Sequence, residues 1–338
     1  MGFFRYFLSL SFVKNMRTAS CHTQKGTSMK DIDVLWSALE EAHSKLKGDV
    51  SGEVASYIPA LAKGGPNSFG IAITDLQGKS YKIGDSDLPF SIQSISKVLT
   101  YGLALHDHGR DYIRARVGVE PTGGAFNSII KLDSNNKPPN PMTNAGAIAI
   151  TDMIKGETQD EKLSIILDAY KSILGQNPKI DMEVYQSEFD TGHRNRAIAH
   201  LLRHFGIMGK DANDALDLYF KQCSILTSAT EISVIAATLA NEGVSPLTNK
   251  RVIQKKYVRD ILSVMFSCGL YDGAGEWAFE VGMPAKSGVS GGILAVVPGK
   301  CGIGIFSPPL DARGNSVRGI KACEILSKRL GWHVLECG

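Results

Sequence analysis

The chain has 338 residues, 43% of them hydrophobic and 21% charged, which is typical of a globular protein with enough apolar material for a sizeable core. Its 37 basic and 34 acidic residues leave a net charge of +3, which gives no electrostatic indication of nucleic-acid binding. The six cysteines form no C-x-x-C pair, so neither a zinc site nor a disulfide framework is predicted. No apolar run approaches the roughly 18 residues that a membrane-spanning helix needs.

The first 28 residues differ in composition from the rest. Residues 1–30 contain basic side chains and no acidic one. An acid-free, basic, serine-containing leader is typical of a transit peptide, but a disordered extension or a start assigned upstream of Met29 also fits. We favour the extension and place residues 1–28 outside the folded domain. A cytoplasmic location is expected, and a mitochondrial one would follow if the leader were a transit peptide.

The first half of the chain predicts a helix, a hairpin and a second helix. Apolar residues at helical spacing predict a helix over residues 31–48. Alternating patterns predict strands at 69–74 and 79–83, joined by a turn. A helix is expected over 94–106, followed by an ordered surface loop over 110–140, which is rich in glycine, proline and asparagine.

Helical patterns dominate residues 145–262, and strand character then returns at 293–297 and 301–306 before a last helix over 316–330. Strands thus lie near both ends of the chain with a long helical block between them. This order predicts an α+β fold in which one antiparallel sheet is assembled from both chain ends and carries an inserted all-helical region.

A single domain over residues 29–331 follows from this order. Its sheet part would comprise residues 29–95 and 265–331, its helical part residues 96–264, and residues 332–338 would form a tail.

The S-x-x-K motif at residues 94–97 lies where a loop is expected to enter a helix. Its spacing brings the Ser94 hydroxyl and the Lys97 amine to one face. Flanking apolar residues would desolvate the amine and lower its pKa, so that it could take the serine proton. The spacing alone is weak evidence, because residues 44–47 share it on what we expect to be an exposed helix face.

A second motif, Lys286-Ser287-Gly288, precedes a strand-forming run. S-x-x-K on an early helix followed by K-[ST]-G on a late strand is the pattern of penicillin-recognising serine hydrolases. The order predicts that a strand edge returns beside the nucleophile helix. The S-x-N element of that pattern has only a weak match at residues 134–136, which we interpret as an ordinary turn.

Several other side chains have both a chemical and a structural interpretation. Tyr57, Tyr219 and Tyr271 offer phenols for proton transfer, but each also fits a half-buried aromatic position. Asn144 could contact a substrate or cap the helix that it opens.

No metal site or cofactor is predicted. His200 and His204 have the i, i+4 spacing of metal ligands, but no third ligand is near them in the sequence.

Many short blocks, all in one order, resemble the serine-dependent glutaminase family. These blocks are Ser56–Pro59, Ser91–Lys97, Glu120–Gly123, Asn140–Ile148, Ser187–Glu188, Gly192–Asn195, Tyr219–Phe220, Cys223–Ser224, Ser267–Asp272, Pro284–Gly292 and Ser307–Asp311. The resemblance covers roughly residues 31–331. It implies a β-lactamase/transpeptidase-like fold and the hydrolysis of L-glutamine to L-glutamate and ammonia without a cofactor.

The resemblance also implies catalytic roles. Ser94 would attack the side-chain amide carbon, and Lys97 would accept the serine proton. Tyr271 would shuttle protons to the leaving ammonia and in deacylation, and Tyr57 would line the same pocket. The backbone N–H groups of Ser94 and Val289 would form the oxyanion hole.

The amino-acid end of the substrate would be held by Asn144, Glu188, Asn195 and Tyr219. A carboxylate such as Glu188 suits an α-ammonium group, and neutral or cationic donors suit an α-carboxylate. Lys286 would add positive field near the site, with its exact role left open.

The chain looks like the short bacterial-type form, because it stops soon after its last helix and carries no C-terminal ankyrin repeats. The segment Gly123–Asn127 is small rather than basic, which does not favour the phosphate activation of the animal relatives. The expected partners are the small-molecule substrate and further copies of the chain in a dimer or tetramer, with no nucleic acid and no membrane.

Two other functions compete with the glutaminase hypothesis. A β-lactamase or peptidase of the same fold would need a clear S-x-N or Y-x-N element and usually an export signal. A non-catalytic binding or scaffold protein would be expected to have lost Ser94 or Lys97, and both are present.

Overall fold

The computed structural model describes residues 29–336 except 64, 123–131, 133–135 and 210. Its strands are β1 (Gly70–Asp75), β2 (Ser80–Gly84), β3 (Phe90–Ser91), β4 (Leu226–Thr227), β5 (Ala285–Gly288), β6 (Gly292–Val297) and β7 (Cys301–Phe306). Five of them form one antiparallel sheet in the order β2-β1-β7-β6-β5, and β3 pairs with β4 separately.

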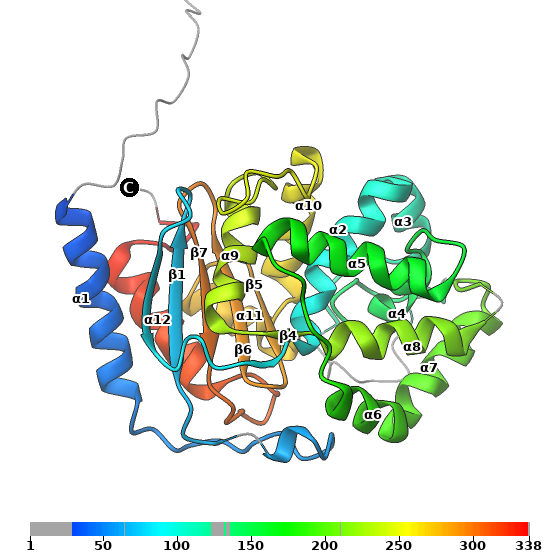
Figure 1. Ribbon diagram of the computed structural model, residues 1–338, viewed down its shortest axis with the longest axis horizontal. Coiled ribbons are helices and arrows are strands. Elements are labelled where there is room, and N and C mark those ends of the chain that lie inside the picture. Colours follow the sequence, from blue (N-terminus) through cyan, green and yellow to red (C-terminus); the bar gives the residue numbers. More distant parts are fainter. Residues whose placement is uncertain (1–28, 64, 123–131, 133–135, 210, 337–338) are drawn as a thin grey trace, which may run out of the picture.

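The helices flank this sheet and form a second region beside it (Figure 1). They are α1 (Met29–Leu46), α2 (Ser96–His108), α3 (Arg110–Arg116), α4 (Asn144–Asp152), α5 (Gln159–Leu174), α6 (Met182–Thr191), α7 (His193–His204), α8 (Ala212–Cys223), α9 (Ala229–Ala240), α10 (Lys255–Cys268), α11 (Ala274–Glu280) and α12 (Val317–Leu330). Short 3-10 turns lie at η1 (Leu61–Lys63), η2 (Gln93–Ile95) and η3 (Tyr271–Gly273).

The sheet is assembled from both ends of the chain, as predicted. Strand β1 lies between β2 and β7, so that residues 70–75 pair with residues 301–306. Helices α2 to α8 lie in the chain between β2 and β5 and form the region at the right of Figure 1. The predicted α+β architecture is confirmed.

The two faces of the sheet are covered differently because successive side chains of a strand point to opposite faces. On β7, Ile303 and Ile305 belong to the apolar cluster that includes residues of α1 and α12. Gly302 and Gly304 alternate with them and face α9. A Cβ atom at Gly304 would lie 1.9 Å from the Ala229 carbonyl oxygen. The glycines therefore let α9 lie directly against the backbone of the sheet.

Two features differ from the sequence predictions. Residues 110–140 were expected to be a loop, but residues 110–116 form α3. That helix has only one buried residue, Ile113, so it shows no apolar repeat from which a helix could be predicted. In addition, α9 lies within the stretch expected to form a separate helical region, yet it covers the sheet.

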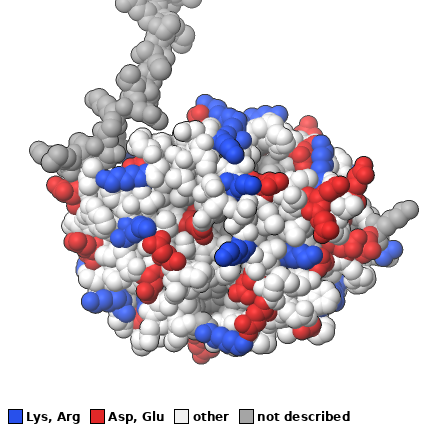
Figure 2. Space-filling view, viewed as in Figure 1, with Lys and Arg blue, Asp and Glu red and all other residues white. Residues whose placement is uncertain are grey.

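The surface carries charges of both signs. On the face in Figure 2, Lys and Arg side chains are interspersed with Asp and Glu side chains. None of the described helices is both long and apolar enough to cross a bilayer. The expected leader at residues 1–28 lies outside the described residues.

The close contact between α9 and β7 can be tested with one added methyl group. We expect Gly304→Ala to lower the free energy of unfolding by about 3 kcal/mol, because the backbone of α9 would have to move away from the sheet. Chemical denaturation measures the effect.

Gly275→Ala is the matched control for this substitution. A Cβ atom at Gly275 meets nothing within 4 Å, and the position lies in α11. This change should leave stability unchanged or raise it by up to about 1 kcal/mol. Equal stabilities of the two variants would refute the tight packing of α9 on β7.

Candidate active site

Ser94 lies in the turn η2, between β3 and the start of α2. Its side chain is mostly buried. Strand β5, which carries the Lys286-Ser287-Gly288 motif, forms an edge of the sheet beside this turn. A Cβ atom at Gly288 would lie 3.0 Å from the Ile92 carbonyl oxygen. The absence of a side chain at Gly288 thus allows the edge strand to approach the Ser94 turn, as the motif order predicts.

Lys97 lies in the first turn of α2 and is 1% exposed. Its Nζ donates hydrogen bonds to Asn144 Oδ1 at 2.7 Å and to the Met142 carbonyl oxygen at 3.2 Å. Both acceptors are uncharged. Burial lowers the pKa of Lys97 to about 8, although Cys223 and Glu188 act in the opposite direction. The amine is therefore about half neutral near pH 8.

The alternative motif at residues 44–47 has no such setting. Ser44 lies on α1 and Lys47 in the turn after it, and both are exposed, as expected from the sequence.

Asn144 is the first residue of α4 and does not cap it. The cap is Thr143, whose hydroxyl accepts a hydrogen bond from the Gly146 N–H. The Asn144 side chain is thereby left to make contacts outside its helix. Its Oδ1 accepts from Lys97, and its Nδ2 donates to Asn195 Oδ1 at 3.1 Å.

Glu188 is a buried carboxyl group on α6. Its Oε1 accepts a hydrogen bond from Gln93 Nε2 at 2.6 Å. Burial raises the pKa of Glu188 to about 7, although the Gln93 hydrogen bond and the Lys97 charge act in the opposite direction. Gln93 adopts a left-handed backbone conformation, with φ +52°, directly before Ser94.

Tyr271 has a left-handed backbone conformation, with φ +57°. Such a conformation costs a non-glycine residue roughly 1–3 kcal/mol, so the surrounding structure must impose it. The hydroxyl donates to the Ser287 carbonyl oxygen at 3.2 Å. Burial raises the pKa of Tyr271 to about 12, and a hydrogen bond with the Ser94 side chain partly offsets the rise. The phenol is therefore neutral and in contact with Ser94.

Lys286 lies behind Tyr271. Its Nζ is 4.1 Å from the centre of the Tyr271 ring and donates to the carbonyl oxygens of Gly269 and Ser287, both at 2.8 Å. Complete burial lowers the pKa of Lys286 well below its usual value, and the Lys97 charge adds to this effect. The charge of Lys97 thus disfavours the charged form of Lys286.

A pocket of about 390 Å³ lies beside these groups. Of the expected site residues, it is lined by Tyr57, Ser94, Asn144, Glu188, Asn195, Tyr219 and Val289. Lys97 and Tyr271 do not line it, but both contact residues that do. About half of the Tyr57 side chain is exposed, yet desolvation and the proximity of Tyr271 and Glu188 raise the pKa of its phenol.

The family model for glutaminases matches residues 52–335. The chain belongs to the glutaminase family. A glutaminase of Trichormus variabilis is 54% identical over 303 residues, which are 90% of this chain and 91% of the relative. A glutaminase of Microcystis aeruginosa is 50% identical and covers 88% of each chain.

Solved structures of glutaminases have the same fold. A probable glutaminase named YbaS aligns with a TM-score of 0.88 and 44% identity, over 91% of this chain and all of that chain. The protein Mglu in its glutamate form aligns with a TM-score of 0.85 and 38% identity, over 89% of this chain and 70% of that chain. The expected β-lactamase-like fold is therefore confirmed.

The pocket of this glutaminase family member also includes residues that the sequence did not single out as site residues. They are Ile58, Gln93, Thr191, Gly192, Arg194 and Cys223. Gln93 directly precedes Ser94 and belongs to the same turn, η2, which brings both residues to the pocket. Cys223 follows Tyr219 by one helical turn, and this i, i+4 spacing was the available signal.

Other candidate residues are not brought to this pocket or cannot be placed. His200 and His204 belong to α7 and do not line the pocket, and among the described residues no three His, Cys, Asp or Glu side chains are grouped as a metal ion would require. The S-x-N match at 134–136 and the segment Gly123–Asn127 fall largely or wholly outside the described residues.

The burial of Glu188 implies a pH-dependent cost in stability. Because its folded-state pKa is raised above the usual 4.5 to about 7, its contribution is most favourable below pH 4.5 and is lost as the pH rises through 7. We therefore expect Glu188→Gln to raise stability by less than about 1 kcal/mol at pH 5 and by about 3 kcal/mol at pH 8. Thermal and urea unfolding at the two pH values measure the difference.

Glu183→Gln, on the exposed side of the same helix, is the control. Its effect should stay below about 1 kcal/mol at both pH values. A Glu188→Gln effect that is the same at pH 5 and pH 8 would contradict the raised pKa.

Proposed function

We propose that this protein hydrolyses L-glutamine to L-glutamate and ammonia through an acyl-serine intermediate. The observation that carries the proposal is the pocket of about 390 Å³, which is lined by both Ser94 and the buried carboxyl group of Glu188. The Ser94 hydroxyl is hydrogen-bonded to Tyr271, which lies beside the pocket. Its relatives named glutaminase are 50–54% identical over most of the chain, which supports the same reaction.

Lys97 would act as the base. A neutral lysine amine has two N–H donors and one lone pair, and its two hydrogen bonds, to Met142 and Asn144, use both donors. The lone pair is then left to accept the proton of the Ser94 hydroxyl, one helical turn away. As the proton leaves, Ser94 Oγ forms a bond to the side-chain amide carbon of the substrate.

The tetrahedral oxyanion would be stabilised by the backbone N–H groups of Ser94 and Val289. Tyr271 would donate its proton to the amide nitrogen as the C–N bond breaks, and ammonia would leave. Water would then attack the acyl-serine carbon and give a proton to the Tyr271 oxygen, and Lys97 would return its proton to Ser94 Oγ as the acyl bond breaks. This step would release glutamate and restore all three groups.

The amino-acid end of glutamine would lie at the opposite side of the pocket. Glu188, once ionised, is the partner for the α-ammonium group. Asn144, Asn195 and Tyr219 would hold the α-carboxylate side. Arg194, an exposed residue that lines the pocket, adds a cation there.

Other expectations stay predictions from the resemblance. They are assembly into a dimer or tetramer, a cytoplasmic location, and a single catalytic domain over residues 29–331. A β-lactamase of this fold is the competing enzyme, and the substrate assay below separates it from a glutaminase.

We expect Ser94→Ala to lower the release of ammonia from L-glutamine at least about a thousandfold, because it removes the nucleophile. The protein should still fold, which circular dichroism checks. Enzyme-coupled ammonia detection with purified residues 29–338 measures the rate, with L-asparagine and nitrocefin as parallel substrates.

Ser44→Ala is the matched control, because it changes the serine of the other S-x-x-K motif on an exposed face. It should leave turnover unchanged. Retained activity of Ser94→Ala would refute the nucleophile assignment. Turnover of nitrocefin but not of glutamine would replace the proposed function with a β-lactamase.

The proposed roles also determine a pH profile. With a pKa of about 8, the neutral fraction of Lys97 rises from about 1% at pH 6 to about half at pH 8. Glu188 ionises through about pH 7. We therefore expect kcat/KM for glutamine to rise from pH 6 and to level off above about pH 9.

Glu188→Gln should remove the part of this rise near pH 7 and leave the part near pH 8. Initial rates at constant ionic strength give both profiles. A wild-type kcat/KM that is flat or falls between pH 6 and pH 8 would exclude Lys97 as the base.

A further inference from the structure

The peptide bond between Leu270 and Tyr271 is held in part by a hydrogen bond from a residue far along the chain, Asn315. The φ angle of Tyr271 is set by where the Leu270 carbonyl group points. That carbonyl oxygen accepts hydrogen bonds from the Gly273 N–H at 3.0 Å and from Asn315 Nδ2 at 3.3 Å. The first bond belongs to the local turn η3, whereas the second comes from 45 residues further along the chain.

Asn315 is also hydrogen-bonded to strand β5, which accepts the hydrogen bond of the Tyr271 hydroxyl. Its Oδ1 accepts from Ser287 Oγ at 2.6 Å, and the Ser287 carbonyl oxygen accepts from the Tyr271 hydroxyl at 3.2 Å. The side-chain amide of Asn315 thus links two groups that hold Tyr271. One is the Leu270 carbonyl group, which precedes Tyr271 in the backbone, and the other is Ser287, whose carbonyl oxygen binds the Tyr271 hydroxyl. Asn315 is 1% exposed and Ser287 is fully buried, so water does not compete for these bonds.

The turn at 311–315 fixes Asn315 in place. Asp311 Oδ1 accepts from the Asn315 N–H and from the Arg313 N–H, both at 2.9 Å. The Asp311 N–H in turn donates to the Asn315 carbonyl oxygen at 2.8 Å. The amide side chain is therefore presented by a preorganised turn.

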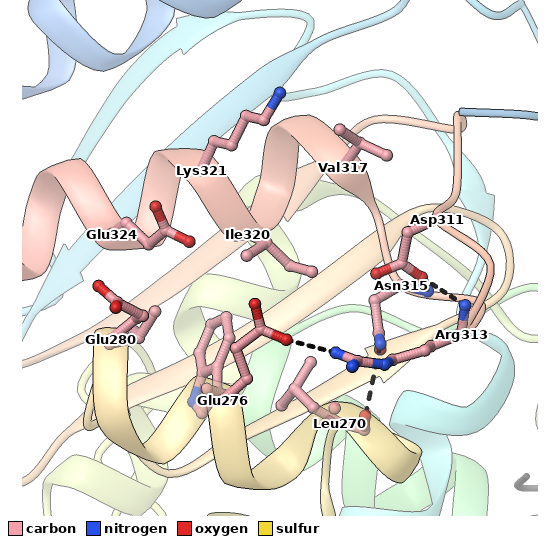
Figure 3. Close-up of a pocket in the computed structure, with 13 residues that line it drawn as sticks. Leu270, Glu276, Glu280, Asp311, Arg313, Asn315, Val317, Ile320, Lys321 and Glu324 are labelled. Atoms are coloured by element: carbon pink, nitrogen blue, oxygen red, sulfur yellow. Dashed lines mark hydrogen bonds and ion pairs between the residues drawn. The ribbon is translucent and has the colours of Figure 1, made fainter. Parts of the chain in front are cut away.

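Asn315 does not reach the substrate pocket. It lines a different cavity of about 260 Å³, together with Leu270, Glu276 and Arg313 (Figure 3). Of the described residues, none lines both cavities. An effect of Asn315 on catalysis must therefore pass through another residue, and Tyr271 is the residue to which its bonds lead.

We propose that Asn315 is a positioning residue that keeps the Tyr271 hydroxyl at Ser94 by fixing the Leu270–Tyr271 peptide bond and the β5 strand together. This inference rests on the proposed glutaminase function. Asn315 acts on the step in which Tyr271 transfers a proton, and it leaves the groups that bind the amino-acid end of the substrate in place.

Asn315→Leu tests this role, because leucine has a similar volume and makes neither hydrogen bond. A misplaced catalytic group can cost a factor of about 100, so we expect kcat for glutamine to fall about ten- to a hundredfold. KM should stay within about threefold of the wild type. The decisive measurement is the same substitution in a Tyr271→Phe background, where it should lower kcat no further.

Ser287→Ala, measured in the same two backgrounds, provides a second test if Asn315→Leu does not fold. It removes only the hydroxyl that holds Asn315 and keeps the carbonyl oxygen that binds Tyr271. A smaller fall in kcat, again absent in the Tyr271→Phe background, is expected. Arg313→Ala is the matched control, because its exposed guanidinium pairs with Glu276, and it should retain wild-type kcat and KM.

Three results would overturn the proposal: an unchanged kcat in both Asn315→Leu and Ser287→Ala, an equal fall with and without the Tyr271 hydroxyl, or a rise in KM at constant kcat. The wild type is assayed in the same series. Failure of the proposed function would appear as a wild type without glutamine turnover, whereas failure of this inference alone leaves the wild type active.

Discussion

The burial of the Lys97 amine against two uncharged oxygen atoms is the constraint on which the site depends. An amine in this setting favours its neutral form, and burial accordingly lowers its pKa to about 8. Its two acceptors come from the segment that leads into α4, so the start of that helix must lie beside the first turn of α2. Thr143 makes this possible by capping α4 and leaving the Asn144 side chain free for Lys97 and Asn195.

The connectivity of the sheet brings the remaining groups to this lysine. Because β1 pairs with β7, the two ends of the chain close one sheet, and its last strand in space, β5, forms an edge. That edge meets the Ser94 turn at Gly288, where an added Cβ atom would lie only 3.0 Å from the Ile92 carbonyl oxygen. On the proposed function, Ser94 thus receives its base, Lys97, from the helical region and its phenol, Tyr271, from the sheet side. Neither region alone contains the arrangement.

Much of this could be predicted from the sequence, and the failures have physical causes. The strands of β1, β6 and β7 and the Ser94 and Lys286 motifs were found because periodicity and fixed spacing are local signals. The helix α3 was missed because its single buried residue, Ile113, produces no repeat. Gln93 was missed because its contact with Glu188 joins residues 95 positions apart. Its left-handed backbone conformation could not be predicted either, because glutamine is not a residue type that indicates a positive φ angle.

On the proposed function, the electrostatics of the pocket explain why a zwitterionic amino acid suits it. Lys97, Lys286 and Glu188 are all buried, and burial displaces the pKa of each toward the neutral form. An incoming α-ammonium group favours the ionised form of Glu188, so substrate binding and loss of the Glu188 proton promote each other. A primary amide without an α-ammonium group offers no such compensation and would leave the buried carboxylate unpaired, which is costly. On the proposed function, the desolvation that weakens the folded protein at high pH therefore also selects the substrate.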